Sequence, residues 1–512
     1  MADWLADAVL YQIYPQSFAD SNGDGIGDLG GVESKLDYLA WLGVNTVWLN
    51  PCFASPMFDA GYDIADYYRV DPRYGSNDDL LKLVDSAGRH GIRVLLDFVP
   101  GHTSNEHPWF VHSANDPDDH RYIWAAEQGP NFQPSPGSRE GFYLPNYFPV
   151  QPALNFGYGR ENEAEPWRQP VDAEGPRANR QALRDIMDFW MGYGIAGFRV
   201  DMAPFLIKDD PGLVETSKLW RDVRAWIDRA HPGTVLLSEW NDPKLAVPAG
   251  FDADFFMHYG ESRAFRSLFH NRAVYDMTWE DPRPAYFDAA GQGSIDVFLA
   301  EWATTAASIG DRGHVILPTA NHDWPRLVAG SRTARHARSA LVFLLTWPTL
   351  PAIYYGDEIG TQYQPGLPDH EGSLLQVFED GFNRAGSRTP MQWDAADPDV
   401  TYLPANPSPT RPDVASQRSD PESNLNLVRE LIALRKANPA LGARGDVSIV
   451  RAGYPFVYRR GEFTVVVNPA LRAATVNVTA PGELVLGQGT SYDAAGLHVE
   501  GYGYGIYRAA RG

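Results

Sequence analysis

Short apolar runs with strand-like composition recur along this chain and alternate with helix-like stretches such as Leu80–His90 and Ser217–Ala230. We expect eight strands, at Val9–Tyr14, Thr46–Asn50, Arg93–Phe98, Gly197–Val200, Val235–Ser238, Asp254–Met257, His314–Pro318 and Ala352–Tyr355. Alternating strands and helices fold as a parallel sheet, and eight such units close into a (β/α)8 barrel. The sequence therefore predicts an α/β protein built on a TIM barrel, with its active site at the carboxyl ends of the strands.

Two segments interrupt this alternation. Residues 103–169 are rich in Pro, Gly, Asn and aromatic residues and are too long for an ordinary loop, so we expect an inserted subdomain after the third strand. After a helix-like stretch at Asn424–Ala437, apolar and polar residues alternate, which predicts a C-terminal all-β sandwich domain. The expected domains are a catalytic barrel of residues 1–102 and 170–438, the inserted subdomain 103–169 and the β domain 439–512.

The charge balance limits the class of partner. The 512 residues carry a formal net charge of −22, which disfavours nucleic acid and anionic membrane as partners and is compatible with a neutral small-molecule substrate. No apolar run reaches the roughly 18 residues of a membrane span, and Met1–Trp4 lacks the basic start of a secretory signal. We expect no membrane association, a cytoplasmic location, and a monomer or small homo-oligomer. The single cysteine, Cys52, excludes an intrachain disulfide.

Three carboxylates follow three of the expected strands, and these are Asp201, Glu239 and Asp323. Arg199 lies two residues before Asp201, so both side chains should point to the same face, where the guanidinium would keep that carboxylate ionised as a nucleophile. Burial and Trp240 would raise the pKa of Glu239 and suit it to general acid catalysis.

Retaining glycosidases hold their two carboxyls about 5–5.5 Å apart, close to the spacing of adjacent strands of about 4.7–4.9 Å. A third carboxylate such as Asp323 can bind sugar hydroxyls and distort the ring. His102 and His322 offer neutral donors at strand ends. The alternatives are a structural Arg–Asp ion pair, a Glu at a helix N-terminus and structural histidines, and each is favoured for a motif taken alone.

The segment Asp20–Asp28 places oxygen ligands at alternate positions, with glycines that allow a tight turn. It resembles the first half of an EF-hand loop, although the twelfth position is Gly31 instead of the bidentate Glu. We expect a structural Ca²⁺, or Mg²⁺, because several carboxylate and amide groups so close together would repel or stay unsatisfied without a cation. The expected ligands are Asp20, Asn22, Asp24, Ile26 and Asp28. An Asp/Gly turn that binds nothing is the alternative.

Several motifs in order resemble the α-amylase superfamily, glycoside hydrolase family 13, in particular its α-glucosidase and oligo-1,6-glucosidase branch. The motifs span nearly all of the chain: Tyr11–Phe18, Gly61–Ile64, Asp97–His102, Gly197–Asp201, Glu239, Asn321–Asp323 and Arg388–Trp393. The resemblance implies that Asp201 is the nucleophile, Glu239 the acid/base and Asp323 the transition-state stabiliser. It also implies the branch's Ca²⁺ or Mg²⁺ site at Asp20–Asp28.

The resemblance further implies how the terminal sugar is bound. His102, Arg199 and His322 would contact the donor glucose, Asp59 would bind its outer hydroxyls, and Tyr62 would stack on its face. Arg384 would pair with Asp59 and close the pocket, with Arg388 as a possible substitute. A closed pocket implies exo-action on a non-reducing terminal glucose.

Four positions depart from the family pattern. Gly101 replaces the Asn before the first histidine, Ala153 replaces an Asp of the inserted subdomain, and Trp324 occupies a place often held by Gln. Met202 follows the nucleophile, at a position that helps to set α-1,4 against α-1,6 preference in this branch. These departures affect the linkage assignment and leave the three acids in place.

The residues leave more than one function open. The first hypothesis is a retaining exo-acting α-glucosidase on short oligosaccharides or glucosides. An α-transglucosidase, a sucrose-cleaving enzyme or a trehalose-interconverting enzyme would use the same machinery, because only the acceptor of the glucosyl group differs. A non-catalytic ectodomain of an amino-acid-transporter heavy chain is disfavoured, since such chains carry a membrane anchor and often lose the acids. A carbohydrate-binding module is suggested only by the 15 Trp and 25 Tyr.

Overall fold

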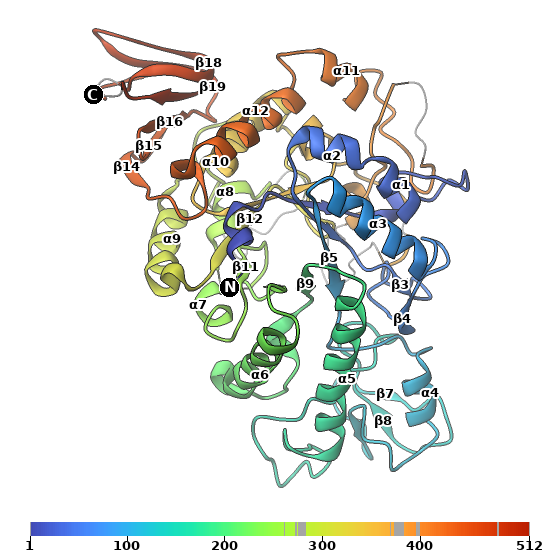
Figure 1. Ribbon diagram of the computed structural model, residues 1–512. Coiled ribbons are helices and arrows are strands. Elements are labelled where there is room, and N and C mark those ends of the chain that lie inside the picture. The colour runs from blue at the N-terminus through green and yellow to red at the C-terminus, as the bar shows by residue number, and fades with distance from the viewer. Residues whose placement is uncertain are drawn as a thin grey trace.

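A closed barrel of eight parallel strands forms the centre of the molecule (Figure 1). The computed structural model describes residues 2–510 except 261, 272–273, 275–282, 369, 373–382, 396–399 and 479–480. The strands follow the order β1-β13-β12-β11-β10-β9-β5-β2. Their bounds are β1 Leu10–Ile13, β2 Thr46–Leu49, β5 Arg93–Phe98, β9 Gly197–Val200, β10 Val235–Ser238, β11 Ala253–Phe255, β12 His314–Pro318 and β13 Leu350–Tyr354. The predicted TIM barrel is confirmed.

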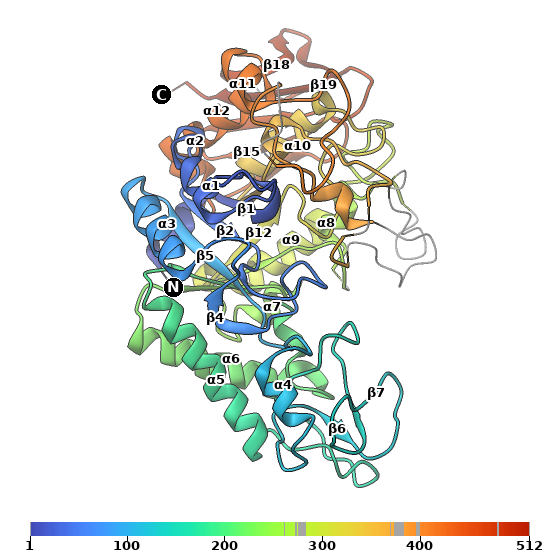
Figure 2. The same ribbon diagram turned by 90° about the vertical axis from the view of Figure 1, so that its right-hand side faces the viewer.

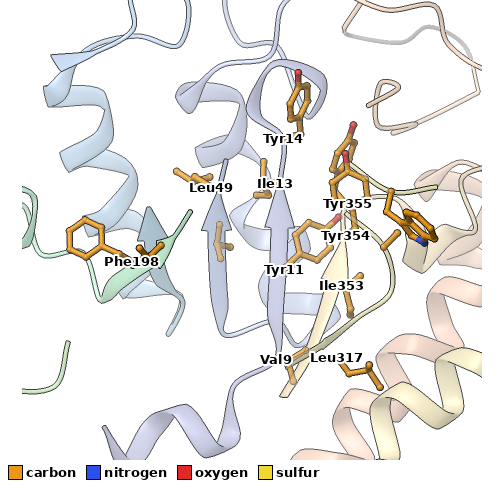
Figure 3. Close-up of a cluster of buried hydrophobic side chains, with 14 of the residues drawn as sticks. Val9, Tyr11, Ile13, Tyr14, Leu49, Phe198, Leu317, Ile353, Tyr354 and Tyr355 are labelled. Atoms are coloured by element: carbon orange, nitrogen blue, oxygen red, sulfur yellow. The ribbon is translucent and has the colours of Figure 1, made fainter. Parts of the chain in front are cut away.

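Alternate residues of the barrel strands pack into two different cores, as the two-residue period of a strand requires. One set fills the barrel interior: Leu10, Trp48, Leu95, Val235, Leu237, Ala253, Phe255, Ile316, Leu350 and Ala352. Their neighbours, such as Tyr11, Ile13 and Leu49, belong to the larger core, which also contains buried residues of the surrounding helices (Figure 3). The polar residues that end the strands are therefore left at the barrel mouth.

Helices surround the barrel and return the chain from one strand to the next. Their bounds are α1 Leu29–Ser34, α2 Leu36–Leu42, α3 Asn77–Arg89, α5 Glu174–Met191, α6 Val214–Ala230, α7 Pro243–Ala246, α8 Ala264–Phe269, α9 Asp296–Ile309, α10 Ala334–Thr346, α11 Val414–Ser419 and α12 Asn424–Ala437. Sequence-local signals set their starts: α3 begins at a capping box formed by Ser76 and Asp79. Every helix in the described part of the chain is too short or too polar to span a bilayer.

Between β5 and α5, the chain forms a small unit beyond the barrel mouth (Figure 2). It contains α4 Pro108–Ser113 and a three-stranded sheet of β6 Trp124–Ala125, β7 Gln133–Pro134 and β8 Phe142–Tyr143. Its aromatic residues pack together, with Phe110 against Trp124 and Tyr143. The shorter pair β3 Phe53–Ala54 and β4 Asp66–Val70 precedes it in the chain.

The C-terminal strands form an antiparallel sheet at the opposite end of the molecule (Figure 2). They are β14 Ser448–Arg451, β15 Phe456–Arg460, β16 Phe463–Val467, β17 Ala474–Val476, β18 Glu483–Asp493 and β19 Gly496–Arg508. Phe456 and Tyr458 pack on Trp347 of the barrel, whereas Val466 and Val499 share a separate core. The predicted all-β domain is confirmed, and its six strands are connected through β19, which pairs with β16, β17 and β18.

Candidate active site

The three acids expected from the sequence lie at the same end of the barrel, each after a different strand. Asp201 directly follows β9 and Glu239 directly follows β10, and β9 and β10 are neighbours. Asp323 lies in the segment after β12, where the side chain of Asn321 accepts a hydrogen bond from its N–H group. Asp201 and Glu239 are both buried, and the Asp323 side chain is a quarter exposed.

Arg199 joins two of these acids to a third buried carboxylate. Its guanidinium lies 2.9 Å from Asp201 Oδ1, 2.7 Å from Glu239 Oε2 and 2.8 Å from Asp97 Oδ1. Asp97 also accepts hydrogen bonds from Trp48 and from the hydroxyl of Tyr62. The sequence predicted the contact with Asp201 and missed the contacts with Glu239 and Asp97, because those residues come from neighbouring strands.

The pKa of Asp201 differs from the sequence expectation, in which Arg199 keeps this carboxylate ionised. Burial and the negative charge of Glu239 raise the pKa of Asp201 well above its usual range, although Arg199 lowers it. Burial also raises the pKa of Asp97 to about 6. Asp201 and Asp97 therefore keep their protons to a higher pH than exposed aspartates do.

The Glu239 carboxyl is held by contacts with a side chain and with the backbone. Besides its contact with Arg199, Glu239 accepts a hydrogen bond of 3.0 Å from the N–H group of Met202. Met202 has a left-handed backbone, with φ of 39°. Glu239 is thus held by Arg199 and Met202, and Arg199 also contacts Asp201.

Asp323 is surrounded by cationic and imidazole groups. Its oxygens lie 2.8 Å from Arg384, 3.1 Å from Arg388 and 3.2 Å from His322 Nε2. Burial alone would raise the pKa of Asp323, but His322 and the two guanidiniums lower it below its usual range. This carboxyl is therefore ionised at neutral pH, which suits a group that stabilises developing positive charge.

Tyr62 and His322 form a stacked pair beside the acids. Their rings are 5.3 Å apart and within 4° of parallel. Gln12 donates a hydrogen bond to Asn50, and Asn50 donates one to the Tyr62 hydroxyl. Burial lowers the pKa of His322 well below its usual range, although the adjacent Asp323 carboxylate raises it. Neither Gln12 nor Asn50 was assigned a role from the sequence, although Gln12 lies within the motif Tyr11–Phe18.

Asp59 contacts both Arg384 and Gln151, a residue of the inserted segment. Asp63 fixes the turn that carries it, since the Asp63 carboxylate accepts hydrogen bonds from the N–H groups of Phe58 and Asp59. Asp59 lies 2.8 Å from Arg384, and Gln151 donates to its other oxygen at 2.8 Å. Arg384 rather than Arg388 is the arginine that pairs with Asp59, and it bridges Asp59 to Asp323.

His102 and Trp324 lie at the edge of this cluster. Both ring nitrogens of His102 have protein partners: Nδ1 lies 3.1 Å from the Asn146 amide and Nε2 lies 2.9 Å from the Tyr62 carbonyl oxygen. Trp324 is buried and stacks on His258 at 4.6 Å. Asn146 could not have been found from the sequence, because it comes from the inserted segment and carries no motif.

The Asp20–Asp28 loop satisfies much of its own hydrogen bonding. Asp20 accepts hydrogen bonds from the N–H groups of Asn22, Gly23 and Gly25, and Asp28 accepts from Ser21 and Gly31. Across the residues that the structure describes, no three His, Cys, Asp or Glu side chains converge as a metal site would. These bonds use part of the acceptor capacity of Asp20 and Asp28, and the expected ion stays a prediction.

We propose the ion for this loop as a testable case. If Ca²⁺ or Mg²⁺ binds there, EDTA is expected to lower the Tm by a few degrees and to leave kcat nearly unchanged, because the ion would stabilise only the folded loop. Scanning calorimetry with and without EDTA, beside Asp24→Ala, measures this. Elemental analysis that finds neither metal in protein purified with both ions would contradict the proposal.

Comparison with known proteins adds the family. The sequence profile of the alpha-amylase catalytic domain matches residues 12–444. The chain is 30% identical to the trehalose synthase/amylase TreS of Mycobacterium tuberculosis, over 85% of this chain and 76% of that protein. It is 31% identical to palatinase of Erwinia rhapontici, over 94% and 93%.

Solved structures are similar to this chain over nearly its whole length. A structure of the trehalulose synthase MutB superposes with a TM-score of 0.82 at 25% identity, over 99% of this chain and 100% of that chain. The alpha-glucosyl transfer enzyme XgtA superposes with a TM-score of 0.79 at 26% identity, with the same coverage.

Proposed function

Because the chain belongs to the alpha-amylase family of catalytic domains, glycoside hydrolase family 13, we propose that it is a retaining, exo-acting α-glucosidase. It would release terminal non-reducing α-linked glucose from short oligosaccharides or glucosides. One observation carries this proposal: Arg384 bridges Asp59 to Asp323 next to the Asp201–Glu239 pair. A bridge at this place would close the far end of the donor pocket, so that only a chain end could enter.

The two-step reaction follows from the positions of the acids. The Asp201 carboxylate attacks the anomeric carbon as the glycosidic C–O bond breaks, and Glu239 gives its proton to the leaving oxygen. The product of this step is a β-glucosyl ester of Asp201. Glu239, now ionised, takes a proton from water, the water oxygen attacks the same carbon, and the ester bond breaks to release α-glucose. Asp323 would stabilise the positive charge that develops on the sugar ring in both steps.

Arg199 supports this proposal because it contacts both reacting carboxyls. A shared guanidinium stabilises one negative charge on the pair, whichever carboxyl carries it. The reaction needs this charge on Asp201 before attack and on Glu239 after it. The arrangement therefore accommodates both halves of the reaction without a change in the total charge of the pair.

Transfer of the glucosyl group to a sugar hydroxyl is the second candidate. It is favoured by the comparisons, since relatives and neighbours are named trehalose synthase, trehalulose synthase and alpha-glucosyl transfer enzyme. Transfer uses the same ester of Asp201 and differs only in the acceptor. Sucrose cleavage and trehalose interconversion belong to this candidate.

A product profile distinguishes the two candidates. Maltose, isomaltose, kojibiose, nigerose, trehalose and sucrose are supplied separately, and the products are followed by proton NMR and chromatography. We expect α-glucose as the first-formed anomer from one or two of them. New disaccharides or oligosaccharides at early times would favour transfer, and β-glucose as the first anomer would contradict retention.

Removal of Asp59 tests the closed pocket. Asp59→Ala is expected to lower kcat/KM on the preferred disaccharide by roughly 10²-fold, because a charged hydrogen-bond acceptor for the sugar hydroxyls is lost. Steady-state kinetics measure the effect, with the exposed Asp37→Ala as control. If the unmutated protein cleaved an oligosaccharide blocked at O4 and O6 of its non-reducing end, this result would contradict a pocket closed by Asp59 and Arg384.

A further inference from the structure

The glycine at position 101 leaves a space that a residue of the inserted segment occupies. A Cβ atom built on Gly101 would lie 3.1 Å from Nδ2 of Asn146, which is closer than most real contacts. Asn146 follows β8 of the inserted unit, so it reaches this place from a distant part of the chain. Its amide lies beside His102, the residue next to Gly101. A longer side chain at position 101 would displace the Asn146 amide from its contact with His102.

A chain of hydrogen bonds runs through this amide. Lys208 Nζ donates to Asn146 Oδ1 at 2.8 Å and to the Phe205 carbonyl at 2.9 Å. Asn146 Nδ2 lies 3.1 Å from His102 Nδ1, and His102 Nε2 lies 2.9 Å from the carbonyl oxygen of Tyr62. Lys208 lies seven residues after Asp201, so the chain of contacts links the loop after the proposed nucleophile to the residue that stacks on His322.

The donors and acceptors in this chain allow only one arrangement of protons. An ammonium has no acceptor, so Lys208 must face the oxygen of the Asn146 amide, and the NH₂ group must face His102. His102 Nδ1 therefore accepts a hydrogen bond and carries no proton. A carbonyl only accepts, so His102 Nε2 carries the proton and donates it to Tyr62. Two independent constraints, from Lys208 and from Tyr62, thus give the same neutral tautomer.

Tyr62 is held at both ends by this arrangement. His102 binds its carbonyl oxygen, and its hydroxyl donates to Asp97 at 3.0 Å and accepts from Asn50. Its ring is parallel to that of His322. His102 therefore contacts the backbone that carries this ring.

We propose that Asn146 and Lys208 are positioning residues, which fix His102 as the neutral Nε2–H tautomer and through it hold Tyr62 in place. The kinetic consequence rests on the proposed function, whereas the tautomer does not. The charged groups that act on His102 are Asp59, whose charge favours the imidazolium, and Lys208, whose charge opposes it, and the ring of Tyr147 lies across it. Burial lowers the pKa of His102 to about 4, in agreement with a neutral ring.

The tautomer is measured directly by histidine ¹⁵N NMR. Long-range proton–nitrogen spectra of the labelled protein report which ring nitrogen carries a proton, and His102 is assigned as the cross-peak lost in His102→Gln. We expect an unprotonated Nδ1 and a protonated Nε2. In Asn146→Asp, a carboxylate oxygen replaces the NH₂ group that faces Nδ1. We therefore expect His102 to gain a proton at Nδ1 at neutral pH. The exposed Asn162→Asp, also in the inserted segment, is the matched control.

Lys208→Met provides a second variant. Without the ammonium, the Asn146 amide can turn its oxygen to His102, so Nδ1 is expected to become protonated at a higher pH than in the wild type. The exposed Lys218→Met is its control. Thermal unfolding of each variant identifies any that fail to fold.

Kinetics test the effect on Tyr62. For Asn146→Asp and Lys208→Met, we expect a loss of roughly 10- to 100-fold in kcat/KM on the preferred glucoside, mainly through KM, because a proton gained at Nδ1 alters the hydrogen bond by which His102 holds the Tyr62 carbonyl. A wild-type His102 protonated at Nδ1, or an Asn146→Asp spectrum like that of the wild type, overturns the proposal. Unchanged kinetics in a variant with an altered protonation of His102 overturns the link to Tyr62. If the protein proves not to be a glucosidase, the NMR result still stands or fails by itself.

Discussion

Asp201→Ala is expected to reduce kcat on the preferred glucoside by more than about 10⁴-fold, because no other group could form the glucosyl ester. The fold should survive, since alanine removes a buried carboxyl whose pKa burial already raises and leaves Arg199 paired with Asp97 and Glu239. Circular dichroism and the Tm check the fold. Asp188→Ala, in which an exposed carboxylate is lost, is the matched control.

Azide provides a sharper test of the same residue. In Asp201→Ala, azide can enter the space of the lost carboxylate and attack 4-nitrophenyl α-glucoside from the face opposite the leaving group. The expected product is β-glucosyl azide, with nitrophenolate released. Near wild-type turnover of the variant without azide would remove Asp201 from the role of nucleophile.

Glu239→Ala is expected to lower kcat by roughly 10²–10⁴-fold on disaccharides, whose leaving group needs a proton. The loss in the first step should be much smaller on 4-nitrophenyl α-glucoside, whose leaving group departs without one. Both substrates are compared by steady-state and pre-steady-state kinetics. The surface variant Glu215→Ala controls for the loss of a glutamate charge.

Azide should give the opposite stereochemistry in this variant. It would attack the glucosyl ester of Asp201 from the side where Glu239 stood, so the expected product is α-glucosyl azide. Equal losses on the two substrates, or β-glucosyl azide from Glu239→Ala, would argue against Glu239 as the acid/base. Together the two variants assign the two carboxyls by the configuration of their products.

Much of the fold was predictable from local sequence. The eight barrel strands were expected within a few residues of their observed bounds, since short apolar runs between helical patterns carry a strong signal. Helix Asn424–Ala437 was expected with its observed ends. The connection of the C-terminal strands into one sheet was not predictable, because strand pairing depends on contacts between residues distant in sequence.

The sequence predicted which residues form the site better than it predicted the contacts between them. A carboxylate after an apolar run is visible in the sequence, so Asp201, Glu239 and Asp323 could be named. The raised pKa of Asp201 could not be foreseen, because it depends on burial and on the charge of Glu239, which lies on the next strand. The sequence expectation that Arg199 keeps Asp201 ionised considered one neighbour, whereas the structure gives that arginine three carboxylates.

The sequence by itself determined the barrel, the family and the residues that end its strands, because periodicity and motif order are local properties of the chain. Only the tertiary structure decided how those residues are connected. It placed Arg384 between Asp59 and Asp323, and it placed the Asn146 amide where Gly101 leaves room. Such contacts join segments that are far apart in the chain, and their hydrogen bonds and charges arise only when folding brings the segments together and removes water from between them.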